Sequence, residues 1–80
     1  MAFHVYILRC SDGTFYVGHT ADQEARIAAH QAGQGATYTQ HRRPVLLVYS
    51  EQSATVSEAI QRENQIKAWS RRKKQALIQG

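Results

Sequence analysis

The feature that most constrains the fold of this chain is a pair of strand-like segments within its first twenty residues. The segments FHVYILR at 3–9 and FYVGH at 15–19 are rich in β-branched and aromatic residues, and the CSDGT between them is typical of a tight turn. Together they predict an antiparallel β-hairpin. Because the chain has only 80 residues, the remainder has to pack around this hairpin to form one modest core.

The hairpin can pair in two registers. A two-residue turn would place Tyr6 and Tyr16 on opposite faces of the hairpin. A three-residue loop, with Gly13 in the left-handed conformation of a G1 bulge, would place Tyr6 opposite Gly18 and both tyrosines on one face. We predict the second register, because it gathers an apolar set on the other face: Phe3, Val5, Ile7, Phe15 and Val17.

A helix, a loop and a third strand are predicted after the hairpin. Residues 20–33 predict a helix, because Thr20 and Gln23 have the spacing of a capping box. The polar, glycine-bearing residues 33–44 predict a loop. The segment VLLVYSE at 45–51 is almost continuously apolar, so it predicts a strand that is buried on both faces.

Two further helices complete the predicted order. Thr55 and Glu58 form a second capping box, so a long helix is predicted from Thr55, and Ser70 separates it from a short basic helix. The order of elements predicts an α+β fold for residues 1–80, a small single domain with a three-stranded antiparallel sheet flanked by helices.

One acid interrupts the apolar stripe of the long helix. Glu63 falls among residues that recur at helical spacing, namely Val56, Ala59, Ile60 and Ile66. A carboxylate partly buried there is costly unless it is paired or binds a metal. An ion pair with Lys67, four residues on, would contribute about 0.3–0.5 kcal/mol. On the helix alone, the ion pair with Lys67 is the favoured interpretation.

Basic residues are in excess and clustered. The chain has ten Lys and Arg against six Asp and Glu, and six of the ten lie in HRR at 41–43 and SRRKK at 70–74. Such clusters indicate a surface that binds a polyanion, with nucleic acid as the leading candidate; the alternative is a solvated face. The candidate phosphate contacts are Arg42, Arg43, Lys67, Arg71, Arg72, Lys73 and Lys74.

Other features exclude several classes of protein. No apolar run is long enough to span a bilayer, and the first residues lack the features of a signal peptide, so we expect a soluble, cytoplasmic protein. The single cysteine, Cys10, cannot form an internal disulfide and has no partner cysteine for a zinc site.

An ordered set of motifs resembles the GIY-YIG nuclease superfamily, especially its small stand-alone bacterial members. The set comprises VYI at 5–7, YVG at 16–18, Arg26, His30 and the helical Glu63, so it covers nearly the whole chain. The resemblance implies a metal-dependent phosphodiesterase with Tyr6, Tyr16, Arg26, His30 and Glu63 as catalytic residues. It also implies that Glu63 holds a single Mg²⁺ or Mn²⁺, and Mg²⁺ commonly takes only one or two protein carboxylates.

Each step of phosphodiester hydrolysis has a candidate residue. Arg26 can stabilise charge on the phosphoryl oxygens. Tyr6 and Tyr16 could orient or deprotonate the attacking water, although a free phenol with a pKa of about 10 is a poor base. His30 could accept the proton directly or relay it from Tyr6, and the sequence does not choose. The resemblance implies no more than an auxiliary phosphate contact for His19.

The first hypothesis is therefore a Mg²⁺-dependent endonuclease that cleaves DNA, in particular structured or damaged DNA as in DNA repair, by in-line attack of water at one metal. RNA remains open as a substrate. The alternatives are a non-catalytic nucleic-acid-binding module and a structural interaction protein. Two departures from the superfamily pattern are Gln75, where relatives often have asparagine, and the lack of an appended DNA-binding domain, from which we expect weak affinity and selectivity.

Overall fold

The computed structural model describes residues 2–80 and begins with the predicted hairpin. Strands β1 (Phe3–Arg9) and β2 (Phe15–Thr20) pair antiparallel, with Tyr6 opposite Gly18. At the turn, the Gly13 N–H donates to the Cys10 carbonyl at 2.9 Å, and Gly13 has a φ of +84°. The three-residue loop with a left-handed glycine is therefore confirmed.

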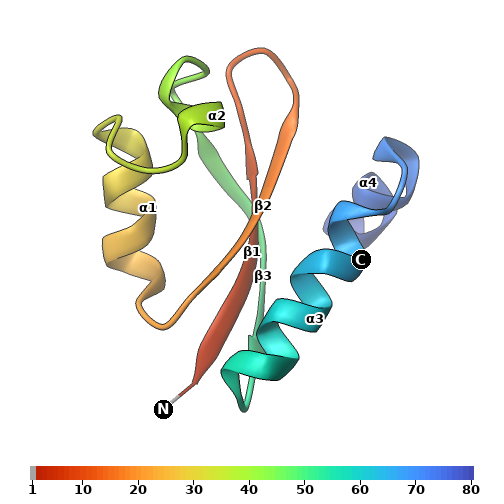
Figure 1. Ribbon diagram of the computed structural model, residues 1–80. Coiled ribbons are helices and arrows are strands. Elements are labelled where there is room, and N and C mark those ends of the chain that lie inside the picture. Colours follow the sequence, from red (N-terminus) through yellow and green to blue (C-terminus); the bar gives the residue numbers. More distant parts are fainter. Residues whose placement is uncertain (1) are drawn as a thin grey trace.

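The third strand, β3 (Leu46–Ser53), pairs antiparallel with β1, so the sheet has the order β2-β1-β3 (Figure 1). The prediction that this strand is buried on both faces was wrong, since Leu46 is 53% exposed and Leu47 is 36% exposed. The central strand is β1, in which Val5 to Leu8 are fully buried. Apolar character alone did not reveal that β3 lies at an edge of the sheet.

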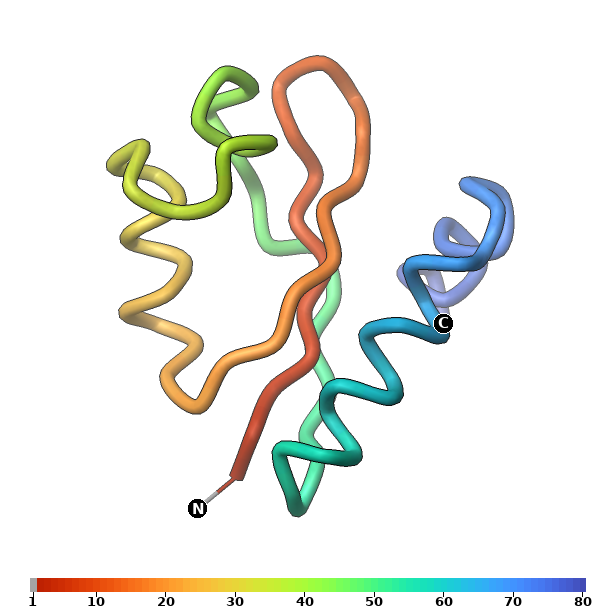
Figure 2. Tube along the Cα trace, viewed as in Figure 1, coloured from red at the N-terminus to blue at the C-terminus, as the bar shows by residue number. Residues whose placement is uncertain are grey.

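Two pairs of helices sandwich the sheet (Figures 1 and 2). Helices α1 (Gln23–Gln31) and the one-turn α2 (Thr37–Gln40) lie on one side, and α3 (Val56–Lys67) and α4 (Arg71–Gln79) lie on the other. The α+β class with a three-stranded antiparallel sheet flanked by helices is confirmed.

One of the two predicted helix caps is confirmed. Thr55 caps α3, accepting a backbone N–H through its hydroxyl. Ser70 separates α3 from α4 as predicted, and its hydroxyl also caps α4. Helix α1 begins later than predicted, because Asp22 and not Thr20 is its N-cap. The predicted loop at 33–44 also contains α2, a single turn too short to show a helical periodicity.

The alternation along β1 divides the buried residues between two clusters. The side facing α3 and α4 carries Val5, Ile7, Val17, Ala59 and Ile66. The side facing α1 and α2 carries Tyr6, Leu8, Cys10 and Val45, with Tyr16, Ile27 and Tyr38 packed against them. Hence Tyr6 and Tyr16 belong to the second cluster, whereas Glu63 lies on the side of the first.

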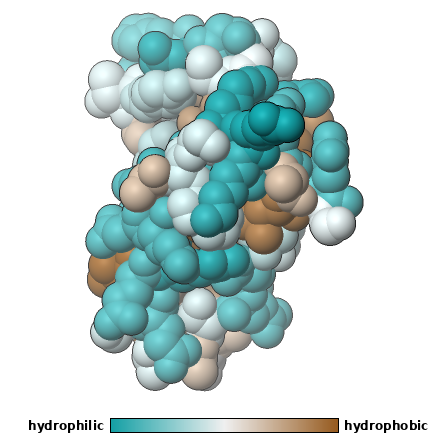
Figure 3. All heavy atoms as spheres, turned by 90° about the vertical axis from the view of Figure 1, so that its right-hand side faces the viewer, coloured by the Kyte–Doolittle hydropathy of each residue, from teal (hydrophilic) through white to brown (hydrophobic). Residues whose placement is uncertain are grey.

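The apolar stripe predicted for α3 is narrower than the sequence suggested. Val56 and Ile60 are 45% and 42% exposed, whereas Ala59 and Ile66 are fully buried. The face of the molecule that carries α3 and α4 is mostly hydrophilic, with separate apolar patches (Figure 3). Within residues 2–80, no helix has the length and apolar character needed to cross a membrane.

Candidate active site

Tyr6 reaches across the sheet to the edge strand. It lies on the central strand opposite Gly18 of β2, and a Cβ built at Gly18 would lie 2.5 Å from the Tyr6 hydroxyl oxygen. Only a residue without a side chain leaves this path open. The glycine therefore lets a buried tyrosine ring place its hydroxyl above β2.

His30 is the hydrogen-bond partner of the Tyr6 hydroxyl. It is the buried residue of α1, and its Nε2 lies 3.0 Å from the Tyr6 hydroxyl oxygen. Its Nδ1 lies 2.8 Å from Thr39 Oγ1, which also donates to the Ala36 carbonyl at 3.0 Å. Burial, reinforced by the nearby positive charge of Arg26, lowers the pKa of His30. The imidazole is therefore neutral near pH 7.

The second tyrosine packs beside the same imidazole. The Tyr16 and His30 ring centroids are 5.2 Å apart, and the Tyr38 ring stacks on Tyr16 at a centroid distance of 6.0 Å. Tyr16 thus shares a face with Tyr6, as the predicted register requires.

Charges from two helices act on the Tyr6 hydroxyl. Burial raises the pKa of Tyr6, the neighbouring Arg26 on α1 opposes the rise, and the charge of Glu63 on α3 adds to it. Arg26 is exposed, one helical turn before His30. Arg26, His30 and Glu63 therefore all influence one phenol, although α1 and α3 cover opposite sides of the sheet (Figure 1).

Glu63 is held by two basic side chains. Its side chain is 12% exposed, and its oxygens lie 2.5 Å from His19 Nδ1 and 2.7 Å from Lys67 Nζ. Burial would raise the pKa of Glu63, but the hydrogen bonds from Lys67 and His19 lower it below its ordinary value. The group is therefore a carboxylate at neutral pH, and the ion pair with Lys67 that the helix spacing suggested is present.

The donor set around Glu63 suits a hard divalent cation that keeps most of its own ligands. No group of three His, Cys, Asp or Glu side chains suited to a metal occurs within the described residues 2–80. Mg²⁺ needs no such group, because it is commonly bound by one or two carboxylates plus waters and substrate phosphate oxygens. Lys67 is 49% exposed and can turn away from the carboxylate, so Glu63 fits a site for Mg²⁺ or Mn²⁺.

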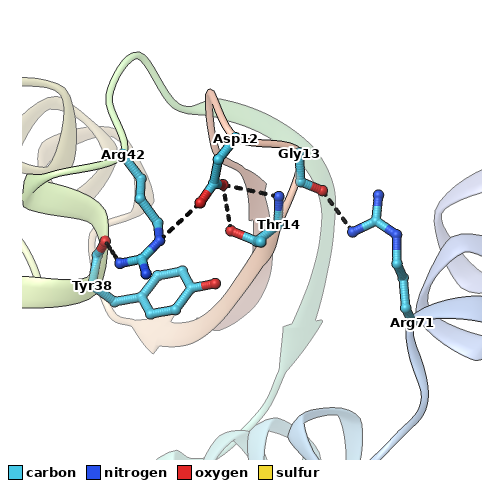
Figure 4. Close-up of polar contacts among 6 residues, drawn as sticks. All are labelled: Asp12, Gly13, Thr14, Tyr38, Arg42 and Arg71. Carbon is cyan, nitrogen blue, oxygen red and sulfur yellow. Dashed lines mark hydrogen bonds and ion pairs between the residues drawn. The ribbon is translucent and has the colours of Figure 1, made fainter.

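The first basic cluster, predicted to contact phosphates, is used within the molecule. Arg42 binds the hairpin turn through Asp12 Oδ2 at 3.0 Å, donates to the Tyr38 carbonyl at 2.9 Å and lies 3.9 Å above the Tyr38 ring (Figure 4). Arg43 donates to the carbonyls of Gln40 and Gln31. In the unbound protein these two arginines anchor the segment that carries α2.

The second basic cluster touches the hairpin turn from the other direction. Arg71 Nη1 donates to the Gly13 carbonyl at 2.6 Å, and its guanidinium lies 4.6 Å from the Phe15 ring centroid (Figure 4). Lys73 lies 4.5 Å from the Trp69 ring centroid, and Arg72 is exposed on the same helix. Gln75 lines a small pocket with Arg9 and Arg71.

Three contacts at this site were missed by sequence reasoning. Thr39, in the segment predicted as a loop, is fully buried against His30, and Gly35 lies so close that a Cβ there would overlap the His30 ring. The bond between His19 and Glu63 joins residues on β2 and α3. None of these contacts has a local signal, because each depends on how separate segments meet.

Comparison with known proteins shows the family. Residues 2–76 match the family described as the GIY-YIG catalytic domain. The chain belongs to the GIY-YIG family. The match runs from β1 into α4, so it includes the hairpin, Arg26, His30 and Glu63, and it places the chain in a nuclease superfamily.

GIY-YIG relatives of similar length include two staphylococcal proteins. A UPF0213 protein of Staphylococcus haemolyticus is 52% identical over 80 residues, covering 99% of this chain and 98% of that protein. A UPF0213 protein of Staphylococcus aureus is 54% identical over 74 residues, covering 92% of this chain and 90% of its own length.

Two solution NMR structures share the fold. The UPF0213 protein of Bacillus halodurans has a TM-score of 0.64 and 43% identity, covering 99% of this chain and 84% of that chain. A protein of E. faecalis has a TM-score of 0.64 and 36% identity, covering 96% of this chain and 83% of that chain.

Proposed function

We propose that this GIY-YIG protein is a divalent-metal-dependent endonuclease that hydrolyses phosphodiester bonds in DNA. The observation that carries the proposal is the hydrogen bond of 3.0 Å between the Tyr6 hydroxyl and His30 Nε2, at a hydroxyl that Arg26 and Glu63 also influence. A phenol joined to a neutral imidazole, with an arginine and a carboxylate close by, supplies a base, a charge stabiliser and a metal ligand for one reaction.

The proton path follows from the protonation states. Because burial keeps Tyr6 as the neutral phenol and His30 as the neutral imidazole, Tyr6 can take a proton from the attacking water while its own proton passes to His30 Nε2. Arg26 stabilises negative charge on the phosphoryl oxygens. Glu63 would hold Mg²⁺ or Mn²⁺, which when bound neutralises charge on the phosphate and on the leaving oxygen.

The basic clusters support a nucleic acid as the substrate. A net charge of +4 and basic residues on both sides of the hairpin turn favour the approach of a phosphate backbone. We propose that the substrate is structured or damaged DNA, selected by its shape, as in DNA repair.

Incubation with branched, nicked and linear DNA, and with RNA of the same sequences, tests this function. We expect cleavage of DNA that requires Mg²⁺ or Mn²⁺ and stops when the metal is chelated. Arg26→Ala should reduce the rate by about 100- to 1,000-fold, because one charge-stabilising donor is lost. It also serves as the control for a contaminating nuclease, whose activity would survive the substitution.

Glu63→Gln keeps the shape of the side chain and removes the charge that would bind the metal. We expect cleavage to be lost and DNA binding to be retained or strengthened, because a carboxylate that repels phosphate is gone. Cleavage that persists in Glu63→Gln but not in Arg26→Ala would refute Glu63 as the metal ligand. Binding without cleavage of any substrate, with either metal, would favour the non-catalytic nucleic-acid-binding module.

A further inference from the structure

Thr39 is a buried polar residue whose hydroxyl takes part in two hydrogen bonds but carries only one proton. It lies on the single turn α2, is fully buried, and joins His30 Nδ1 at 2.8 Å to the Ala36 carbonyl at 3.0 Å. A hydroxyl can donate only one hydrogen bond but can accept others. The assignment of its proton therefore decides which nitrogen of His30 carries hydrogen.

The Ala36 carbonyl resolves this assignment. A carbonyl oxygen can only accept, so the Thr39 hydroxyl has to donate to it, a bond that threonines within helical turns commonly make. The bond between Thr39 and His30 must then be donated by the imidazole, from Nδ1. In a neutral imidazole this leaves the lone pair on Nε2, which is the nitrogen that faces the Tyr6 hydroxyl.

We propose that Thr39 is a positioning residue that holds His30 as the Nδ1–H tautomer, so that Nε2 is free to accept the proton of Tyr6. The inference rests on the proposed function for its catalytic consequence, although the tautomer itself does not. The opposite tautomer would present an N–H to the Tyr6 hydroxyl, and His30 could then take no proton from it.

The residues around the His30 ring prevent it from changing its orientation. Gly35 leaves just enough room for the His30 ring, since a Cβ at residue 35 would overlap Nδ1. The rings of Tyr6 and Tyr16 approach the imidazole at centroid distances of 5.9 and 5.2 Å. The imidazole is therefore fixed in orientation as well as in tautomer, as is usual for functional histidines whose second nitrogen is hydrogen-bonded.

A matched pair of substitutions tests the proposal. Thr39→Val keeps the branched shape and removes the hydroxyl, whereas Thr39→Ser keeps the hydroxyl and removes a methyl group. The tautomer is measured from the ring ¹⁵N chemical shifts of His30 in ¹⁵N-histidine-labelled protein, without metal or DNA, and His30→Gln assigns the signal. We expect the Nδ1–H form in the wild type and in Thr39→Ser, and a shift towards Nε2–H in Thr39→Val.

The kinetic expectation separates positioning from substrate binding. The kcat of DNA cleavage should fall by about 10- to 100-fold in Thr39→Val, the usual effect of removing a partner that orients a functional histidine, and should recover in Thr39→Ser. The KM for DNA should be unchanged, because Thr39 is buried. An Nε2–H tautomer in the wild type would overturn the proposal even if Thr39→Val did not fold, and so would an unchanged tautomer in folded Thr39→Val. Since the ring measurement needs no catalysis, failure of this assignment and failure of the nuclease function are distinguishable.

Discussion

The Tyr6 ring fills the space that a side chain at Gly18 would need. A Cβ at Gly18 would lie 2.5 Å from the Tyr6 hydroxyl oxygen and 2.7 Å from the ring carbon that bears it. Tyr6 is fully buried and hydrogen-bonded to His30, so it has little freedom to give way. Gly18 is therefore needed for the position of Tyr6, the candidate catalytic tyrosine.

Gly18→Ala should destabilise the fold by about 1–3 kcal/mol, the usual cost of overpacking a well-filled core. The free energy of unfolding in urea measures this cost. In a Tyr6→Leu background the same substitution should cost much less, because the clashing ring atoms are gone. An equal cost in both backgrounds would show that Tyr6 is not what excludes a side chain at residue 18.

The lowered pKa of His30 predicts a loss of stability in mild acid. Burial is the main cause of the shift below the ordinary value of 6.5, and the charge of Arg26 adds to it. As the pH falls below 6.5, the unfolded chain takes up a proton at His30 before the folded protein does, so the free energy of unfolding decreases. Above 6.5 both states are neutral at this residue and the full stability is present.

Urea unfolding at a series of pH values between 7.5 and 5 checks this expectation. His30→Gln removes the titrating group and leaves the other three histidines in place, so its stability should depend less steeply on pH. Parallel curves for the two proteins would mean that His30 titrates alike in the folded and unfolded states.

Lys67 holds its positive charge beside the carboxylate of Glu63, where a bound metal ion would add a second positive charge. Its Nζ lies 2.7 Å from Glu63 Oε2 and has to leave when the cation arrives. Lys67→Met should therefore increase the affinity for Mn²⁺ by about 1.4- to fivefold, since an ion pair near the surface is worth about 0.2–1 kcal/mol. Titration calorimetry of the DNA-free protein measures this affinity.

The control for that measurement is Lys73→Met, which removes the same charge from α4. Lys73 lies over Trp69 and makes no ion pair with Glu63, so its loss should leave the affinity for Mn²⁺ unchanged. Weaker binding in Lys67→Met would show that the lysine assists the metal site instead of competing for it.

Arg72 is the best-suited residue for testing the second basic cluster, because Arg71 also anchors the hairpin turn and Lys73 packs on Trp69. If Arg72 contacts a duplex phosphate, Arg72→Gln should reduce the slope of log affinity against log salt by about 0.9. Arg72→Lys keeps the charge and should keep the slope. An unchanged slope in Arg72→Gln would identify the residue as part of a solvated face.

Local patterns in the sequence were sufficient to predict the register of the hairpin, the cap at Thr55 and the break between two helices at Ser70. Alternation separates apolar residues from tyrosines only in one register, and a glycine at residue 13 meets the left-handed turn that this register needs. A capping hydroxyl binds a backbone N–H three residues away. Each of these signals lies within a few residues, so it can be read before any tertiary contact forms.

The tertiary structure decided the features that join distant segments. Whether an apolar strand is central or at an edge depends on its neighbours, which is why β3 was misread. The same holds for the partners of titratable groups: Glu63 meets His19 across 44 positions, and His30 meets Thr39 only because a short turn folds back over α1. The sequence by itself determined which groups could carry the chemistry, and packing decided their partners, because burial and hydrogen bonding across the sheet set the charge and tautomer of each group.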